Sequence, residues 1–491
     1  MITAKPCSVL RSRLLQFLSA LVLLSSAPFV DAASSPETRV SIGPRTALDR
    51  YVAQPDTNFQ HHVVETILGE GVTTYVVELT SQAWLTTNEV NHPLWKHWLT
   101  IVKPDNTSQR AALLVIGGGD RAKKAPSKPN TVSIMIAKAT GSVVADLSGI
   151  PNQPLIFAGT TNRVKEDDLI AYSWEQFLKT GDERWPARLP MTKAVVRAMD
   201  TITAVLASPE GGKTQVNQFF VMGASKRGWT TWTTAAVDNR VIGIAPAVID
   251  ALNLGPSLLH HYGAYGFFAP AVGSYTNRHI MDWAGTPEFK ELARIEDPYE
   301  YRDRLTLPKF VISASGDQFF PTDSARHYFK DLTGTKYLRI VPNANHSLNG
   351  MDSWMSILAC YDAMLKKSPL PEFEWKAEGT GAVRVTTHSK PSDVRIWQAT
   401  NEKARDFRIE SLGAVWSDTE LKPEPDGSYL TRVEKPAQGW RAFFVELTFT
   451  TTGPAPFKFT TEAYVLPDTL PFRFTPPTPA PKREPTRKSG T

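Results

Sequence analysis

The sequence predicts an α/β fold in which helices flank a mostly parallel β-sheet, followed by a small all-β region. Apolar runs of strand length alternate with helical spacing between residues 73 and 365, which is typical of parallel strands buried on both faces. After about residue 370 the helical spacing disappears, and short β segments alternate with polar turns that contain Gly and Pro. Hydrophobic residues make up 42% of the 491 residues, so a large core is expected.

The first 32 residues differ in character from the rest of the chain. Basic residues up to Arg13 precede an apolar run over residues 14–24, and Val30-Asp31-Ala32 offers small residues at a cleavage position. This pattern indicates a secretory signal peptide, with an uncleaved N-terminal anchor as the alternative. We therefore expect export to the periplasm or the exterior, without stable membrane insertion after cleavage.

Charge and cysteine content narrow the function classes. Residues 1–32 carry a net charge of +2 and residues 482–491 one of +3, which together account for the formal charge of +5. The body of the chain therefore lacks the basic excess of a nucleic-acid-binding protein, and no nucleic-acid partner is expected. Cys7 lies in the expected signal peptide. Cys360 then remains alone, so no intramolecular disulfide is expected, and its thiol should pack as a small apolar group.

The α/β region is expected to span residues 33–369. Its opening strands, residues 73–79 and 98–102, have no helix between them, which favours an antiparallel entry to the sheet. Residues 250–304 interrupt the alternation with an aromatic, Gly-rich insertion, a candidate lid or substrate wall. The other expected strands are residues 111–116, 142–147, 219–222, 241–248, 309–314 and 336–341, and the expected helices are residues 131–140, 191–207, 229–237 and 348–365.

The C-terminal part is expected to contain two segments. Residues 370–470 should form a small β-sandwich, and residues 471–491 a Pro-rich, basic and disordered tail. The expected β segments are residues 383–387, 394–397, 407–409, 440–449 and 463–466.

One turn in the α/β region carries a candidate nucleophile. The apolar run over residues 219–222 ends at Gly223 and is followed by Ser225, Gly228 and a helical stretch. A serine on a sharp turn between a strand and a helix is typical of a nucleophile elbow, which lifts the hydroxyl clear of the sheet. The spacing is Gly-x-Ser-x-x-Gly, with Arg227 in the place of the usual second glycine. An ordinary turn whose serine caps the helix gives the same pattern. Residues elsewhere in the chain must therefore distinguish a nucleophile from a helix cap.

An acid and a base follow later strands in the chain order that α/β-hydrolases use. Asp317 and His346 each come directly after an expected strand, which gives the order Ser, Asp, His. His346 would take the proton of Ser225, and Asp317 would orient the imidazole and stabilise its protonated form. Asp323 is the alternative acid. Asp317 as a turn residue and His346 as a capping or buried histidine are the structural alternatives.

Backbone amides are the candidates for an oxyanion hole. The Lys226 N–H lies at the head of the helix after Ser225, and Gly118 and Gly119 lie in a Gly-rich loop after the strand over residues 111–116. A plain loop is the alternative interpretation of the glycines.

His260 and His261 are a candidate metal pair. No carboxylate or cysteine lies at ligand spacing from them, so packing in the substrate wall is favoured. No other metal or nucleotide motif is recognised, and no cofactor is expected.

Several segments together carry a resemblance to a known family. They include Pro93-Leu94-Trp95-Lys96-His97-Trp98, Ile116-Gly117-Gly118-Gly119, Gly223-Ala224-Ser225-Lys226-Arg227-Gly228-Trp229, Gly316-Asp317-Gln318-Phe319-Phe320 and Pro342-Asn343-Ala344-Asn345-His346. Across roughly residues 45–465 the chain resembles the PhoPQ-activated pathogenicity-related protein family. The resemblance implies an α/β-hydrolase core with a C-terminal β domain, exported from a bacterium. A more distant likeness connects it to prolyl-oligopeptidase-type serine peptidases and to some carbohydrate esterases, although Arg227 departs from the peptidase pattern.

The function predicted from these features is that of an exported serine hydrolase. It would form an acyl-enzyme on Ser225 and cleave an ester or amide bond in a small-molecule or peptide substrate. A carbohydrate-directed carboxylic esterase is the alternative within the enzymes. A non-catalytic secreted binding protein on a hydrolase scaffold is the alternative outside them, because fold does not fix function.

Overall fold

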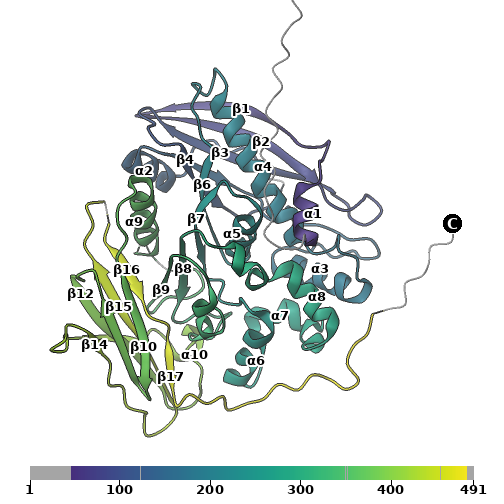
Figure 1. Cartoon of the computed structure of the whole chain (residues 1–491). Coiled ribbons are helices and arrows are strands. Elements are labelled where there is room, and N and C mark those ends of the chain that lie inside the picture. Colours follow the sequence, from purple (N-terminus) through teal and green to yellow (C-terminus); the bar gives the residue numbers. More distant parts are fainter. Residues whose placement is uncertain (1–45, 122, 349, 351, 454, 484–491) are drawn as a thin grey trace, which may run out of the picture. The chain divides into compact units, whose positions relative to one another are not determined.

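The computed structural model describes residues 46–121, 123–348, 350, 352–453 and 455–483 (Figure 1). The expected signal peptide, residues 1–32, lies outside these residues, as does the end of the tail, residues 484–491. No helix in the described ranges is both long and apolar enough to span a bilayer.

The central sheet begins antiparallel and then becomes parallel. Its strands are β1 (Gln60–Gly69), β2 (Val72–Ala83), β3 (Leu94–Pro104), β4 (Ala111–Ile116), β5 (Val143–Leu147), β6 (Gln218–Ala224), β7 (Val241–Ala247), β8 (Lys309–Ala314) and β9 (Lys336–Val341). They lie in the order β1-β2-β3-β5-β4-β6-β7-β8-β9. In this spatial order, the pairs from β1 through β2 and β3 to β5 are antiparallel. The pairs from β5 through β4, β6, β7 and β8 to β9 are parallel. The predicted α/β-hydrolase class, with its antiparallel entry, is confirmed.

Strand β1 has no counterpart among the expected strands. Its side chains are mostly exposed, so no apolar run marks it in the sequence. Backbone pairing with β2, which extends from Gln60–Thr80 to Gly69–Val72, forms the strand instead. A strand of this kind is stabilised through its partner rather than by burial of its own side chains.

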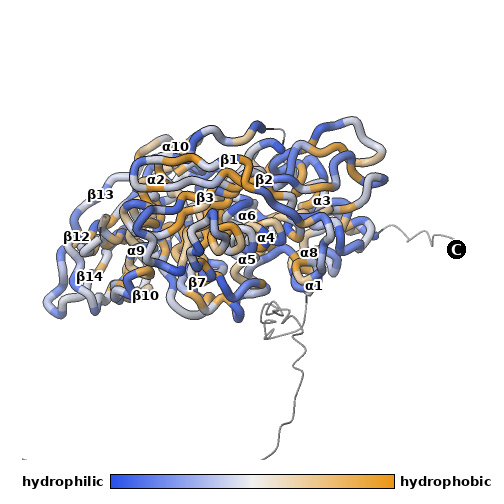
Figure 2. Tube along the Cα trace, turned by 90° about the horizontal axis from the view of Figure 1, so that it is seen from above, coloured by the Kyte–Doolittle hydropathy of each residue, from blue (hydrophilic) through white to orange (hydrophobic). Residues whose placement is uncertain are grey.

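Helices cover both faces of the parallel strands. The helices α1 (Ala47–Ala53), α3 (Asp167–Thr180), α4 (Arg188–Ala207) and α5 (Lys226–Val237) contribute to one hydrophobic core, and α2 (Thr131–Thr140) and α9 (Asp352–Lys366) contribute to the other. Successive side chains of β6 alternate between the two cores, with Phe219 and Val221 in the first and Phe220 and Met222 in the second. Hydrophobic segments accordingly gather around the central strands, and the outer loops are mostly hydrophilic (Figure 2).

The order of the strands changes direction between β4 and β6. The chain passes from β4 to β5 on one side and later returns to β6 on the other. Such a switch point opens a crevice at the carboxyl ends of the strands, where ligands bind in open α/β sheets. Ile116 at the end of β4 pairs with Gly223 near the end of β6, so the loops that follow these strands are neighbours.

The segment between β7 and β8 is mostly helical. It contains α6 (Leu254–Tyr265), η1 (Pro270–Val272), α7 (Gly273–Thr276), η2 (Ile280–Trp283), α8 (Pro287–Glu296) and η3 (Pro298–Arg304). This is the stretch in which the sequence predicts an aromatic, Gly-rich insertion. Its aromatic, Gly-rich residues 258–268 fall mostly in α6 and in the turn that follows it.

The C-terminal strands extend the central sheet as well as forming a sheet of their own. They are β10 (Phe373–Gly379), β11 (Ala382–Thr387), β12 (Asp393–Asn401), β13 (Ser417–Glu420), β14 (Tyr429–Leu430), β15 (Trp440–Phe449), β16 (Phe457–Thr460) and β17 (Tyr464–Leu466). Thr460 of β16 pairs with Leu338 of β9, and β15, β12 and β13 continue outward, while β10, β11 and β14 form a further sheet. Val383 and Phe443 belong to a small core between the sheets. The expected segment over residues 407–409 forms no strand, and α10 (Ile409–Leu412) begins at its end.

The first part of the tail departs from the expected disorder. The N–H of Phe472 donates to the carbonyl of Gly263 over 3.1 Å, and the ring of Phe474 lies 5.1 Å from that of Phe268. Arg483 forms a 2.6 Å ion pair with Glu291. A Pro-rich composition indicates disorder, but aromatic side chains within it supply apolar contacts, and residues 471–483 use them to pack against the helical insertion.

Candidate active site

Ser225 occupies a strained turn between β6 and α5. Its backbone angles are φ 57° and ψ −129°, a region that costs a non-glycine residue about 1–3 kcal/mol. Its N–H donates to the carbonyl of Ala247 over 2.8 Å, and its carbonyl accepts from the Trp229 N–H over 2.9 Å. The turn is therefore held by β7 on one side and by the first turn of α5 on the other. Strain that the surrounding structure maintains in this way is characteristic of functional sites.

The two glycines of the motif are required by close backbone approach. A Cβ atom on Gly223 would lie 2.7 Å from the carbonyl oxygen of Arg227, and one on Gly228 would lie 2.9 Å from that of Ala247. Position 228, rather than 227, therefore faces the neighbouring strand. This geometry explains the unusual spacing of the motif and leaves position 227 free to carry a long side chain.

Asp317 and His346 meet at the carboxyl ends of β8 and β9. The Nδ1 atom of His346 lies 3.0 and 2.9 Å from the two carboxylate oxygens of Asp317. The Phe319 N–H also donates to Asp317 over 2.7 Å. The backbone N–H of His346 donates to the side chain of Gln318 over 2.9 Å. These bonds orient the imidazole and direct its Nδ1 atom toward the acid.

The other ring nitrogen of His346 has no partner within the part of the chain that the structure describes. Its Nε2 atom is buried and forms no hydrogen bond there, including with Ser225. The ring of Phe319 lies 4.2 Å from the imidazole, and Phe319 and Ser225 line the same cavity. Hydrogen bonds between a nucleophile and its base are often long without substrate. A free, buried Nε2 atom is suited to accept a proton at this end of the sheet.

Asp323, the alternative acid, lies in a different network. Its carboxylate is 2.9 Å from Nε2 of His260 and 2.7 Å from the Arg405 guanidinium, and it is fully buried. Burial alone would raise the pKa of Asp323, but His260 and Arg405 outweigh it and hold the pKa well below its usual range. Asp323 thus connects the helical insertion to the loop after β12, and, of the residues that the structure describes, His346 is not one of its hydrogen-bond or ion-pair partners.

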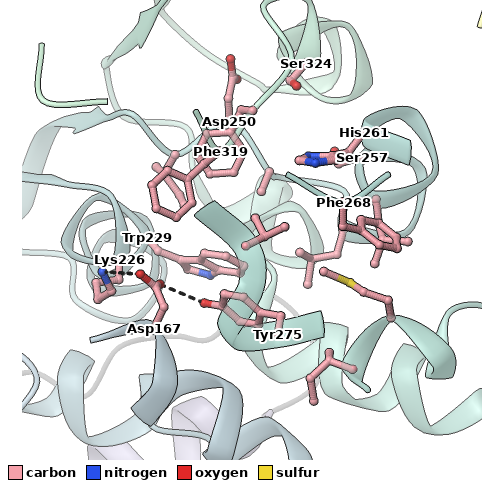
Figure 3. Close-up of a pocket in the computed structure, with 18 of the residues that line it drawn as sticks. Asp167, Lys226, Trp229, Asp250, Ser257, His261, Phe268, Tyr275, Phe319 and Ser324 are labelled. Carbon is pink, nitrogen blue, oxygen red and sulfur yellow. Dashed lines mark hydrogen bonds and ion pairs between the residues drawn. The ribbon is translucent and has the colours of Figure 1, made fainter. Parts of the chain in front are cut away.

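The two adjacent histidines of the insertion have separate roles. His260 pairs with Asp323, whereas Nε2 of His261 accepts a hydrogen bond from the Ala269 N–H over 2.9 Å. His261 lines the cavity beside Ser225 (Figure 3). No group of three or more His, Cys, Asp or Glu side chains among the described residues is arranged to hold a metal ion.

The Gly-rich loop after β4 lies next to the elbow. Gly117 and Gly118 accept hydrogen bonds through their carbonyls from the N–H groups of Ile150 and Gly149, over 3.1 and 3.0 Å. These hydrogen bonds hold the carbonyl groups of the loop in place. The Lys226 N–H stands at the start of α5, where backbone amides have no acceptor within the helix. The donors that the sequence predicts thus lie directly after two neighbouring strands, the loop glycines after β4 and Lys226 after β6.

Arg227 links the elbow to the loops around it. Its Nε donates to the carbonyl of Ile150 over 2.5 Å, and its two terminal nitrogens each donate over 2.7 Å to the carboxylate of Glu166. The guanidinium also packs against Gly118, where an added Cβ atom would lie 2.4 Å from it. Burial would raise the pKa of Glu166, but Arg227 and Lys226 lower it to about 2. Arg227 thus supports both the elbow and the Gly-rich loop from outside the cavity.

Glu166 and Asp167 are site residues that sequence reasoning missed. They lie at the start of α3 and pair with the Lys226 ammonium over 2.9 and 3.1 Å. Glu166 also adopts positive φ, at 53°, close to the conformation of Ser225. A signal was present in the adjacent acids before a helix, but such a run is usually a solvated helix start, so it carries little information on its own.

We expect Arg227→Ala to lower the free energy of unfolding by about 1–3 kcal/mol, because the Ile150 carbonyl and the Glu166 carboxylate lose their donor. Chemical denaturation measures this effect. Arg184, which pairs with carboxylates but is 55% exposed, is the matched control, and Arg184→Ala should change stability by at most about 1 kcal/mol. An Arg227→Ala variant of unchanged stability that no longer reacted with a fluorophosphonate probe would contradict the bracing role and indicate a substrate contact.

A cavity of about 110 Å³ opens beside Ser225. Its walls come from α3, α5, the helical insertion and the segment after β8. In Figure 3 the rings of Trp229, Phe268, Tyr275 and Phe319 surround it. Asp250 lies at the end near Ser324, where the hydroxyls of Ser313 and Tyr328 donate to it. Burial raises the pKa of Asp250 to about 7.

Comparisons with known proteins give the following similarities. An acetyl xylan esterase from Thermoanaerobacterium sp. has a TM-score of 0.43 and 13% identity over 65% of this chain and 92% of its own. For a glucuronoyl esterase from Solibacter usitatus the TM-score is 0.38, with 14% identity over 64% and 89%. The autocrine proliferation repressor protein A of Dictyostelium discoideum is 38% identical over 460 residues, 87% of this chain and 92% of that protein. Residues 48–408 match the family model of the PhoPQ-activated pathogenicity-related protein.

Proposed function

The chain belongs to the PhoPQ-activated pathogenicity-related protein family, and we propose that it is an exported serine hydrolase that cleaves an ester or amide through an acyl-enzyme on Ser225. The observation that carries the proposal is the pairing of His346 with Asp317 after β9 and β8, together with the strained conformation of Ser225 after β6. The order of these residues along the chain and their places after β6, β8 and β9 are those of an α/β-hydrolase triad.

The proposed reaction uses each of these groups in turn. The Ser225 hydroxyl attacks the scissile carbonyl while Nε2 of His346 takes its proton. The Asp317 carboxylate stabilises the imidazolium without taking the proton itself. The oxyanion accepts hydrogen bonds from the Lys226 N–H and from the loop of Gly118 and Gly119. His346 then returns the proton to the leaving group, and a water molecule that it activates releases the acid from Ser225.

Pre-steady-state kinetics on a panel of substrates tests the proposal. The panel contains p-nitrophenyl esters, aminoacyl p-nitroanilides and a glucuronoyl ester. An acyl-enzyme mechanism predicts a burst of p-nitrophenol, stoichiometric with enzyme, when deacylation is the slower step. Turnover of the p-nitrophenyl esters would indicate a carboxylic esterase, and turnover of the anilides a peptidase. Turnover of the glucuronoyl ester alone would indicate a carbohydrate-directed esterase. A folded protein that turns over none of them would favour the non-catalytic binding protein.

Export is the second part of the proposal. Residues 1–32 have the charge and hydropathy of a signal peptide. We expect the secreted or periplasmic protein to begin at Ala33, because cleavage would follow the small residue Ala32. N-terminal sequencing of protein from cell fractions measures this. A protein that retains Met1 and stays with the membrane fraction would support an uncleaved anchor instead.

A further inference from the structure

The cavity beside Ser225 is walled mainly by apolar side chains. They come from separate elements, which include α3, α5, α6 and α7. Figure 3 shows aromatic rings on several sides of the space. The apolar side chains that define it include Trp174, Trp229, Leu254, Leu258, Phe268 and Tyr275.

Each basic group in the cavity wall is already engaged within the protein. Lys226 pairs with Glu166 and Asp167. Arg188 pairs with Glu296, and both of these side chains are almost fully buried. Neither cation is therefore available to neutralise a charged substrate.

The remaining ionisable groups of the wall are also satisfied. Asp167 accepts from the Tyr275 hydroxyl over 3.2 Å in addition to its pairing with the Lys226 ammonium. Asp250 accepts from two hydroxyls. His261 accepts from a backbone amide, and burial lowers its pKa to about 4. A group that enters the cavity thus meets a mainly apolar wall in which each ionisable side chain already has a partner. A charged or polyhydroxylated group would therefore lose hydration without gaining partners.

The position of His346 indicates which side of the scissile bond the cavity receives. His346 returns a proton to the leaving group in the proposed mechanism, so the leaving group must approach its Nε2 atom. His346 is not among the described residues that line the cavity, whereas Ser225 and Lys226 are. The leaving group therefore lies outside the cavity, and the acyl group lies inside it.

From these observations we propose that the cavity is an acyl pocket that selects substrates with a bulky, uncharged, apolar acyl group. Phenylalkanoyl and medium-chain alkanoyl esters belong to this class, as do amides with a hydrophobic residue on the acyl side. This inference rests on the proposed serine hydrolase function. An acetyl group would leave most of the pocket unfilled, and a uronoyl group would present hydroxyls to an apolar wall.

A series of p-nitrophenyl esters with a constant leaving group tests the selection. The acyl groups are acetyl, butyryl, hexanoyl and 3-phenylpropanoyl, and a glucuronoyl ester provides the polar comparison. We expect kcat/KM to rise roughly threefold to fourfold for each methylene group that the pocket buries. A flat profile, a preference for acetyl, or a preference for the glucuronoyl ester would overturn the inference.

Two adjacent leucines of α6 provide matched variants. Leu258 lines the cavity, whereas Leu259 is 48% exposed. We expect Leu258→Trp to lower the ratio of 3-phenylpropanoyl to acetyl kcat/KM at least about tenfold, which corresponds to the loss of two buried methylene groups. Leu259→Trp should leave this ratio at its wild-type value. If Leu258→Trp does not fold, Leu258→Ala enlarges the pocket and should move the optimum to a longer chain. An unchanged ratio or optimum in a folded Leu258 variant would contradict the assignment.

The outcomes separate this inference from the function on which it rests. Hydrolysis of any ester with a burst supports the serine hydrolase, and its acyl profile then supports or overturns the pocket assignment. A folded protein that hydrolyses no ester and does not react with a fluorophosphonate overturns both.

Discussion

Replacing Ser225 by alanine is expected to lower kcat by about 10⁶-fold, because removal of a nucleophilic serine from a triad eliminates covalent catalysis as a unit. Binding should persist, so KM should change far less than kcat. The measurement is steady-state kinetics on the best ester of the panel, with protein of verified fold. Residual activity within tenfold of wild type would show that Ser225 is not the nucleophile.

The same position offers a test of the strain in the elbow. Alanine keeps a Cβ atom and therefore keeps the unfavourable φ of 57°. Glycine relieves strain of about 1–3 kcal/mol but costs about 0.5–1 kcal/mol through its greater freedom in the unfolded chain. We expect Ser225→Gly to unfold at a higher temperature than Ser225→Ala, although both are inactive. The reverse order in calorimetry would argue against a strained turn.

The second large effect is expected at Asp317. Asp317→Asn should lower kcat by about 10⁴-fold with little change in fold, because an amide favours the wrong tautomer of His346 and cannot stabilise the imidazolium. Kinetics and thermal unfolding measured on the same preparation distinguish the two effects. An active Asp317→Asn variant would remove this residue from the mechanism.

Asp323→Asn is the matched comparison, because Asp323 is also a buried partner of a histidine but one outside the site. Its loss should lower stability by about 3–5 kcal/mol, since His260 and Arg405 would be left without their carboxylate. The activity per folded molecule should remain far above that of Asp317→Asn. If the order of the two activities is reversed, Asp323 is the catalytic acid.

Much of the fold is encoded in local patterns. The parallel strands are continuous apolar runs because both of their faces are buried, so β4 to β9 could be located from the sequence alone. Strand β1 could not, since its exposed side chains leave no such signal. Residues 471–483 illustrate the opposite error, in which a composition typical of disorder hides aromatic residues that pack on a distant helix.

The candidate site also contains residues that the sequence predicts and residues that it does not. Ser225, Asp317 and His346 each follow a strand directly, so their approximate positions follow from the topology of the sheet. The sequence favours Asp317 over Asp323 as the acid, because Asp317 directly follows a strand, and the structure places Asp317 against His346. Glu166 and the cavity wall come from helices distant in sequence, and no local pattern indicates that they converge. The partners of Arg227, the Ile150 carbonyl and the Glu166 carboxylate, likewise come from segments distant in sequence.

The central claim is that Ser225 is a nucleophile activated by His346 and Asp317. Its most direct test is labelling of the folded wild-type protein with a fluorophosphonate probe, followed by mass spectrometry of the labelled peptide. The account predicts one phosphonyl group per molecule on Ser225, and no labelling of Ser225→Ala. Labelling of another residue, or equal labelling of Ser225→Ala, would contradict it.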